Sequence, residues 1–332
     1  MTTLVTGGAG YIGSHAVLAL RAIGEDVVVL DDLSTGQREN VPPDTEFHLG
    51  DAGDEATVRQ LIQRRKIDAI MHFAGSVVVP ESIVKPLSYY HNNTVKSRAL
   101  VAAAVAEGTE HMIFSSTAAV YGMSKEGIVP ESAETRPISP YGSSKLMTEV
   151  MLADAAKAHA FRFVALRYFN VAGADPGGRA GQSTRRATHL IKVACQTALG
   201  LHPQLNVYGA DYPTPDGTGV RDYIHVSDLA EAHVAALRYL RDGGEPKILN
   251  CGYGRGYSVL EVIDAVKRIS GRAFKVVMAP RRDGDPASLV AGTGLIDSTL
   301  AWTPRFADLD TIVRHAYAWE ARLKEKGAAL SQ

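Results

Sequence analysis

The sequence predicts an α/β fold, a doubly wound parallel sheet with helices on both faces, followed by a smaller C-terminal lobe. Short apolar runs, typical of strands buried on both faces, alternate with helical stretches through residues 1–171. Gly, Pro and polar residues then become frequent. We therefore expect one domain over 1–171 and a second lobe over 172–332, with some segments returning to the main sheet.

The first elements form a compact unit. They are a strand at 2–6, the turn Gly7–Gly13 (Gly-Gly-Ala-Gly-Tyr-Ile-Gly), a helix to about Ile23, and a strand that ends at Asp31. This order is typical of a Rossmann βαβ unit, in which the N-terminus of the helix faces the phosphates of a dinucleotide. Gly10 lets a pyrophosphate approach the backbone. Asp31 would bind the adenosine ribose hydroxyls and repel a 2′-phosphate, so NAD is favoured over NADP.

The later elements continue the alternation. We expect strands at 46–49, 68–75, 111–116 and 163–167, with helices at about 54–65, 87–107 and 141–159. In the second lobe we expect helices near 188–199, 227–240, 258–269 and 308–322, and a strand at Ile248–Asn250 that returns to the main sheet.

The strongest catalytic signal is Tyr141-Gly142-Ser143-Ser144-Lys145, in which tyrosine and lysine lie four residues apart on one helix face. A tyrosine with a pKa near ~10 needs a positive neighbour to act as a base at neutral pH. Thr117, at the end of the Ser115–Thr117 strand exit, supplies a third polar group. An isolated pair of this kind is typical of a helix surface; its place after a dinucleotide fold favours catalysis.

Several motifs together resemble the UDP-glucose 4-epimerases of the NAD-dependent epimerase/dehydratase family, which are extended short-chain dehydrogenases/reductases. The resemblance runs from the N-terminus to about residue 320. The motifs are the glycine turn, His72–Gly75, Ser116–Gly122, Ser139–Lys145, Arg167–Asn170, Asp211–Val226 and Ala279–Asp285.

The resemblance implies reversible epimerisation at C4 of a UDP-sugar through a transient 4-keto sugar, with bound NAD as cofactor and Tyr141 as base. It also implies the family's homodimer, with a four-helix bundle built from helices 87–107 and 141–159. The catalytic residues are then Tyr141, Lys145 and Thr117.

The sequence and the resemblance together assign two sets of binding residues. The cofactor-binding set is Gly7, Gly10, Tyr11, Ile12, Gly13, Asp31, Asp32, Asp51, Ala52, Phe73, Ala74, Gly75, Asn93, Ser115, Tyr141, Lys145, Tyr168 and Phe169. The substrate-binding set is Thr117, Asn170, His189, Leu190, Tyr208, Arg221, Arg282, Asp285 and Leu289.

Four positions bear on specificity. Thr117 replaces a serine common in the family and keeps the hydroxyl. Val77 replaces a lysine, which removes a cofactor contact. Thr188-His189-Leu190 stands where many members have Asn-Asn-Leu. Leu289 stands at the gate, the position that limits the size of the sugar in the family. A Tyr there admits only plain hexoses and a small residue admits N-acetyl sugars; leucine is intermediate in size.

The same residues bear on three competing functions. A 4,6-dehydratase needs an acid directly after the hydroxyl residue that follows the 111–116 strand, here Thr117, and this chain has Ala118-Ala119 at that place. A UDP-pentose (xylose or arabinose) 4-epimerase uses the same machinery and stays open. A non-catalytic NAD-sensing module is disfavoured by Tyr141 and Lys145.

Composition and residue spacing limit the partners, location and metal binding to be expected. A formal net charge of −1 favours neither nucleic acid nor an anionic membrane, and no apolar run reaches the length of a bilayer span. The first strand begins at once, which leaves no room for a signal peptide. Cys195 and Cys251 are expected as free thiols in the cytoplasm. No Cys/His cluster has metal-binding spacing.

Overall fold

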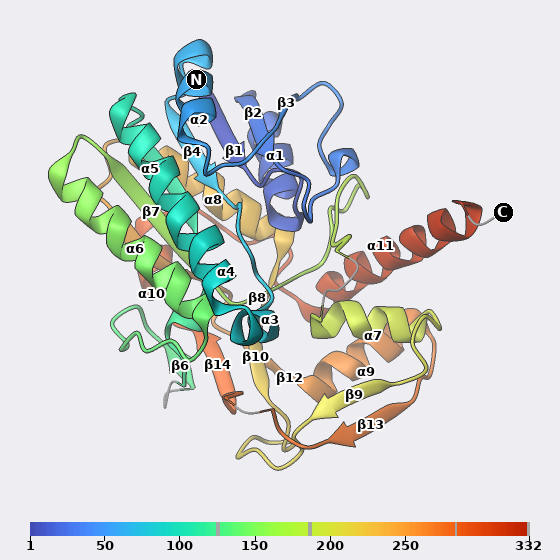
Figure 1. Cartoon of the computed structure of the whole chain (residues 1–332). Coiled ribbons are helices and arrows are strands. Elements are labelled where there is room, and N and C mark those ends of the chain that lie inside the picture. Colours follow the sequence, from blue (N-terminus) through green and yellow to red (C-terminus); the bar gives the residue numbers. More distant parts are fainter. Residues whose placement is uncertain (124–126, 185–187, 283, 331–332) are drawn as a thin grey trace.

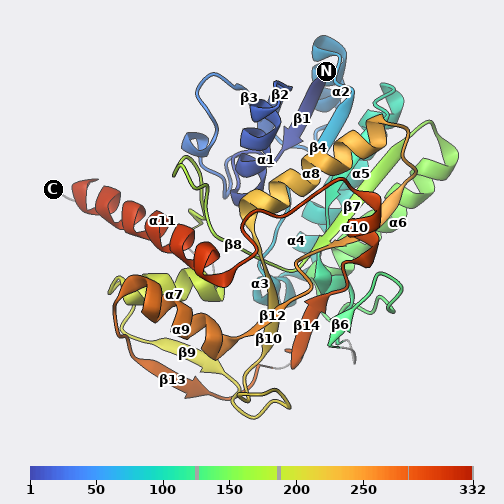
Figure 2. The ribbon, with the colours of Figure 1, turned by 180° about the vertical axis from the view of Figure 1, so that it is seen from behind.

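A computed structural model describes residues 1–123, 127–184, 188–282 and 284–330 (Figures 1 and 2). Its centre is a seven-stranded parallel sheet with the order β11-β7-β5-β4-β1-β2-β3. The strands are β1 (Thr2–Thr6), β2 (Asp26–Asp31), β3 (Glu46–Leu49), β4 (Ala69–His72), β5 (His111–Ser115), β7 (Arg162–Tyr168) and β11 (Lys247–Cys251). The predicted doubly wound sheet is confirmed.

Helices cover both faces of this sheet. One layer consists of α2 (Glu55–Arg65), α4 (Pro86–Tyr90), α5 (Lys96–Ala106) and α6 (Pro140–Ala158). The opposite layer, in front in Figure 2, contains α1 (Tyr11–Ala22) and α8 (Val226–Arg241). Each layer encloses its own apolar core against the sheet. Strand residues therefore meet apolar neighbours on both sides, which explains their continuous apolar runs.

Helix α8 is placed differently from the sequence-based expectation, which put residues 227–240 in the smaller lobe. It packs along α1 and against β5 and β7. Leu229, Val234 and Leu237 are buried in the same core as Val17 and Leu20 of α1. The α1 face of the sheet would otherwise expose apolar side chains, and the apolar stripe of α8 covers it.

The stretch expected as one helix over 87–107 contains a change of helical type. Between α4 and α5 the five residues His91–Val95 form a π-helical turn. Asn93, within this turn, is buried and hydrogen-bonds to both backbone groups of Ser76, at 2.7 Å and 2.9 Å. The wider turn lets the asparagine side chain reach the loop after β4, which is typical of π-bulges at functional sites.

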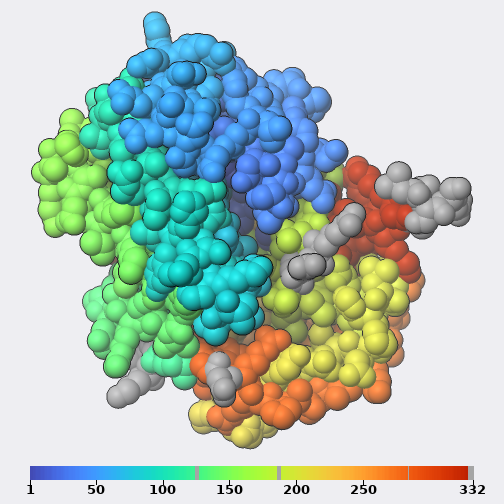
Figure 3. All heavy atoms as spheres, in the orientation of Figure 1, coloured from blue at the N-terminus to red at the C-terminus, as the bar shows by residue number. Residues whose placement is uncertain are grey.

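A smaller lobe lies below the main sheet in Figures 1 and 3. Strands β6, β8, β10, β12 and β14 form one sheet, and β9 and β13 pair in parallel. Their bounds are β6 (Ile128–Val129), β8 (Asn170–Ala172), β9 (Leu205–Tyr208), β10 (Val220–His225), β12 (Gly256–Ser258), β13 (Val276–Ala279) and β14 (Ser288–Ala291). The lobe's helices are α7 (Leu190–Ala198), α9 (Val259–Ser270) and α11 (Leu309–Leu330), which pack on one another.

Short helices complete the connections. They are α3 (Val79–Val84), α10 (Gly294–Thr299) and the 3₁₀ turns η1 (Arg38–Asn40) and η3 (Ala118–Val120).

A buried ion pair ties α6 to the sheet. Glu149 of α6 and Arg167 of β7 are 1% and 5% exposed. The Arg167 guanidinium donates to both carboxylate oxygens of Glu149, at 2.6–3.2 Å, and to the Tyr121 hydroxyl at 3.0 Å. Tyr121 donates in turn to Asn250 of β11 at 2.7 Å. Each buried charge thus has its partner, which is the condition for keeping it in the core.

Arg167→Met tests this pair. The variant leaves the Glu149 carboxylate buried without its counter-ion, so we expect the free energy of unfolding to fall by about 3–5 kcal/mol. Urea unfolding followed by circular dichroism measures it. Lys157→Met, which breaks the exposed Lys157–Asp154 pair, serves as the control and should unfold close to wild type. Equal midpoints for Arg167→Met and the control would contradict the assignment.

Candidate functional site

The glycine turn closes tightly between β1 and α1. Gly7 has φ +72°, and a Cβ there would lie 2.5 Å from the backbone nitrogen of Ala74, at the exit of β4. A Cβ on Gly13 would lie 2.2 Å from the Gly7 carbonyl oxygen. Gly10, by contrast, would meet only that carbonyl, at 3.2 Å, and it caps α1 without any side-chain hydrogen bond.

The space in front of Gly10 therefore suits a phosphate group. The first N–H groups of a helix lack partners within the helix, and they face this space together with the positive end of the helix dipole. Tyr11, Ile12 and Gly13 begin α1 at this point. The turn fits the pyrophosphate of a dinucleotide.

Asp31 lies at the end of β2, where a ribose would follow. Its carboxylate accepts hydrogen bonds from the backbone N–H groups of Ala9, at 2.9 Å, and Leu33, at 2.8 Å. Burial raises the pKa of Asp31, and the two N–H groups oppose that rise. These contacts fix the carboxylate beside the glycine turn and leave lone pairs on both oxygens for ribose hydroxyls. Asp32 instead turns to Ser34.

The expected adenine edge follows β3. Asp51 pairs with Lys96 at 2.6 Å and accepts the N–H of Gly53 at 2.8 Å. Ala52, beside it, is buried. This segment lies next to β2 through the β2–β3 pairing, so it is on the side of the sheet where the adenosine half of a dinucleotide is expected.

The three predicted catalytic residues are brought together at the carboxyl edge of β5. The Thr117 hydroxyl accepts the N–H of Ala119 at 3.1 Å, which leaves its proton for the hydrogen bond to the Tyr141 phenol. Lys145, one turn after Tyr141, donates to the carbonyl oxygen of Ser115 at 2.9 Å. All three side chains are buried.

Burial shifts both titrating groups toward their neutral forms. It raises the pKa of the Tyr141 phenol, and the hydrogen bond from Thr117 opposes part of that rise. It lowers the pKa of the Lys145 ammonium to about 8, and the carboxylate of Glu149 opposes this shift. At neutral pH the lysine therefore keeps its charge, one helical turn from the phenol.

The other predicted contacts of the nicotinamide half line the same region. The Asn93 side chain donates to the Ser144 hydroxyl at 3.0 Å, and its amide oxygen Oδ1 lies 2.9 Å from where a Cβ of Gly75 would stand. The Ser115 hydroxyl and the Tyr168 hydroxyl share a hydrogen bond of 2.6 Å. Phe73 packs on His233, and Phe169 is buried near the strand exit.

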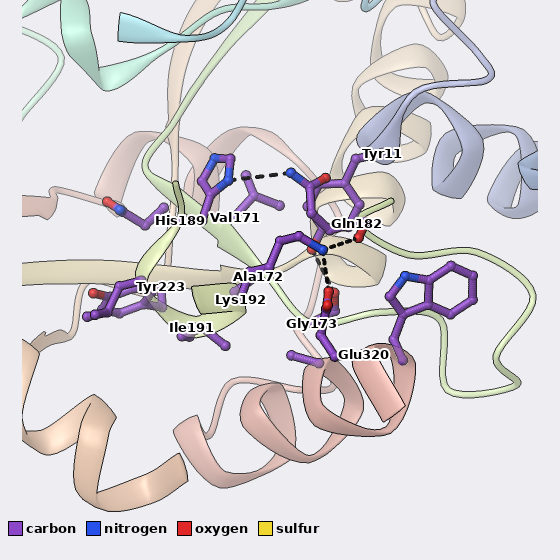
Figure 4. Close-up of a pocket in the computed structure, with 14 residues that line it drawn as sticks. Tyr11, Val171, Ala172, Gly173, Gln182, His189, Ile191, Lys192, Tyr223 and Glu320 are labelled. Carbon is purple, nitrogen blue, oxygen red and sulfur yellow. Dashed lines mark hydrogen bonds and ion pairs between the residues drawn. The ribbon is translucent and has the colours of Figure 1, made fainter. Parts of the chain in front are cut away.

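Figure 4 shows a pocket between Tyr11 of α1 and the smaller lobe, which contributes residues of β8, α7 and α11. Four predicted residues line it: Tyr11, Asn170, His189 and Leu190. Two further lining residues, Lys192 of α7 and Glu320 of α11, were not predicted from the sequence. They form an ion pair, and Lys192 also donates to the Gln182 carbonyl at 2.7 Å. Lysine and glutamate stand 128 residues apart, so no local pattern could reveal the pair.

The remaining predicted substrate residues form a cationic group on the smaller lobe. Arg282 stacks on the ring of Tyr208, with the guanidinium carbon 3.8 Å from the ring centroid. Arg221 of β10 forms an ion pair with Asp285. Leu289 is the register partner of Arg221 on β14. Asp283, within the same sequence motif, lies outside the described residues.

Leu289 also lies near the catalytic edge. It packs against the buried cluster that contains Ala118, Val120 and Phe169. The β10–β14 pairing therefore places the predicted gate between the cationic group and the Thr117 segment.

The structure also bears on metal binding and on membrane insertion. Across the described part of the chain, no group of three or more His, Cys, Asp or Glu side chains is arranged to hold a metal ion. Within the same residues, every helix is too short or too polar to cross a membrane.

Comparison with known proteins gives a consistent result. Residues 3–252 match the NAD dependent epimerase/dehydratase family. A UDP-glucose 4-epimerase of Azospirillum brasilense is 55% identical over 322 residues, which cover 97% of this chain and 92% of that protein. A crystal structure of a UDP-glucose 4-epimerase superimposes with a TM-score of 0.95 at 42% identity, covering 98% of both chains.

A further crystal structure, of a UDP-glucose 4-epimerase from Stenotrophomonas maltophila with bound NAD and formylated UDP-arabinopyranose, has a TM-score of 0.95 at 40% identity. It covers 98% of this chain and 99% of its own. The family match extends over three quarters of the chain, and the similarity to these enzymes extends over nearly all of it. The chain belongs to the NAD-dependent epimerase/dehydratase family.

Proposed function

We propose that this protein is a UDP-sugar 4-epimerase that interconverts UDP-glucose and UDP-galactose with NAD as its cofactor. The observation that carries the proposal is the buried Thr117–Tyr141 hydrogen bond, one helical turn from the Lys145 ammonium, at the carboxyl edge of a dinucleotide-type sheet. The similarity to UDP-glucose 4-epimerases over nearly the whole chain supports the same activity.

Tyr141 is the proposed general base for the sugar 4-hydroxyl. Its phenol is buried, so it becomes a phenolate only with a cation close by. The Lys145 ammonium supplies that charge, and Thr117 holds the phenol and the sugar oxygen in one line of hydrogen bonds. NAD, held by the glycine turn and Asp31, would supply reversible hydride transfer at C4 of the sugar.

The arginines of the smaller lobe suit the diphosphate. A guanidinium binds phosphate oxygens through two parallel N–H groups. Arg282, stacked on Tyr208, presents such a fork. Arg221 is held by Asp285, and a diphosphate would compete with that carboxylate. The substrate residues thus anchor the nucleotide, while the sugar reaches the Tyr141 edge.

A UDP-pentose 4-epimerase is the second candidate. One relative of similar fold was crystallised with NAD and formylated UDP-arabinopyranose, a sugar whose pyranose ring has the same size as that of glucose. Tyr141 and Lys145 are both in place beside Thr117, so a purely NAD-sensing module explains the site less well.

Apolar exposure supports a homodimer. Five large apolar side chains are exposed on α3, α4, α6 and the π-helical turn: Val84, Leu87, Val95, Met147 and Val150. These elements pack together in one layer of the fold. A second copy would cover this face in a bundle of helices. We also propose a cytoplasmic location, since both cysteines are buried as free thiols.

Incubation with UDP-galactose, UDP-glucose and UDP-pentoses, followed by product separation, tests the function. Wild-type protein should interconvert the two hexoses. Tyr141→Phe removes the proton acceptor, so we expect kcat to fall by about 10²–10⁴-fold. Binding of UDP, measured by calorimetry, should survive. Near-normal turnover of this variant would exclude Tyr141 as the base, and conversion of pentoses alone would favour the second candidate.

Leu289→Ser tests sugar size. Leucine at this gate is bulkier than serine and offers no hydroxyl to an acetamido group. We therefore expect kcat/KM for UDP-N-acetylglucosamine to be about 10- to 100-fold below that for UDP-glucose in wild type, the range that about 1–3 kcal/mol of steric discrimination provides. The serine variant should narrow this gap. Equal efficiency on both sugars in wild type would show that Leu289 is not the gate.

Asp31 sets the expected cofactor preference. The fixed carboxylate would lie against the 2′-phosphate of NADP, and two like charges at that distance repel. Protein stripped of cofactor should bind NAD at least about tenfold tighter than NADP, or about 1.4 kcal/mol. Competition calorimetry measures the ratio. Equal or tighter binding of NADP would contradict the role given to Asp31.

A further inference from the structure

Helix α6 carries a third buried polar residue in line with the two catalytic ones. Tyr141, Lys145 and Glu149 follow at intervals of four residues, so they lie along one face of the helix. The first two act at the proposed reaction centre. Glu149 is 1% exposed and lies one turn further from it, where a substrate does not reach.

The carboxylate of Glu149 is fully engaged. It accepts the Ser116 hydroxyl and the Arg167 guanidinium, the latter through Nε at 3.0 Å and through Nη2 at 2.6 Å. Arg167 continues to the Tyr121 hydroxyl and so to Asn250. The Glu149 carboxylate is thus bonded to Arg167 of β7 and, through Tyr121, linked to Asn250 of β11. The same carboxylate accepts the hydroxyl of Ser116, the residue that follows β5.

Ser116 is the middle residue of the segment that meets the catalytic groups. Its neighbour Ser115 accepts the Lys145 ammonium through its carbonyl oxygen, at 2.9 Å. Its other neighbour, Thr117, hydrogen-bonds to Tyr141. The Ser116 side chain also reaches α6, where its hydroxyl donates to Glu149. The Ser116 hydroxyl therefore adds a side-chain contact to the backbone hydrogen bond from Ser116 to the Leu166 carbonyl, at 2.9 Å, between the two catalytic contacts.

We propose that Glu149, acting through the Ser116 hydroxyl, is a positioning residue that sets the Thr117 hydroxyl and the Ser115 carbonyl against Tyr141 and Lys145. This inference rests on the proposed epimerase function. Glu149 touches neither substrate nor cofactor. Its charge also acts on Lys145. Its effect through Ser116 is geometric, and displacing a catalytic group by about 1 Å can lower a rate by about 10²-fold.

Ser116→Ala tests the proposal because it removes only the hydroxyl and leaves the Glu149–Arg167 pair intact. We expect kcat for UDP-galactose to fall by about 10- to 100-fold. KM should stay within about twofold, because the residues that bind the nucleotide lie on the other lobe. The wild-type assay run in parallel separates the two claims: an inactive wild type overturns the proposed function, not the positioning.

Ser82→Ala is the matched control. Ser82 is equally buried and donates a single hydrogen bond within α3, to the Val79 carbonyl at 2.7 Å. It should lose a similar amount of stability in urea and keep wild-type kcat. If Ser116→Ala keeps wild-type kcat, or if its loss is matched by Ser82→Ala, the hydroxyl has no positioning role and the proposal is wrong.

A double-mutant cycle with Glu149→Ala asks whether both residues act through one contact, because alanine removes the oxygen that accepts the Ser116 hydroxyl. If they do, adding Ser116→Ala to Glu149→Ala lowers kcat no further than Glu149→Ala alone. Multiplied effects in the double variant would overturn the proposed route through Ser116. If Glu149→Ala does not fold, the kcat and KM of Ser116→Ala against its control still decide the matter.

Discussion

The ion pair between Glu149 and Arg167 is the interaction on which the catalytic edge depends. Two full charges lie in a core whose other members are mostly apolar, and either charge buried without the other would strongly destabilise the fold. Their hydrogen bonds cross from α6 to β7 and extend through Tyr121 to β11. The helix that carries Tyr141 and Lys145 is therefore locked to the sheet by directional bonds as well as by packing, which non-directional apolar contacts alone would not ensure.

The cofactor half of the site is built from backbone more than from side chains. The exits of β1 and β4 approach so closely that Gly7 has no room for a Cβ, and α1 begins immediately beyond. Asp31 then uses its carboxylate to hold two backbone N–H groups around this turn. A parallel sheet aligns all these strand ends at one edge, so a single extended ligand can touch each of them.

The substrate half depends on segments brought together from distant parts of the chain. Arg221 and Leu289 become neighbours only through the β10–β14 pairing, and Lys192 and Glu320 only through the packing of α7 on α11. Arg221 meets Asp285 in the same way. Lys192 and Glu320 line the pocket of Figure 4, and Leu289 packs against the buried cluster that contains Ala118.

The sequence by itself determined the local features: the glycine turn, the acid that ends β2, and the four-residue spacing of Tyr141 and Lys145. Each is a short pattern whose geometry follows from the periodicity of a helix or from the end of a strand. The resemblance of the sequence motifs to those of known epimerases also predicted the epimerase activity, which the comparisons support.

Tertiary structure decided where α8 lies, why Asn93 sits in a π-helical turn, and which residues hold the catalytic edge in place. Glu149 has the spacing of a helix-face residue, yet nothing in its neighbours reveals that Arg167 and Ser116 will surround it. Those contacts arise from packing between segments far apart in the chain. The free energy that selects them comes from burying whole faces, which no short window of sequence contains.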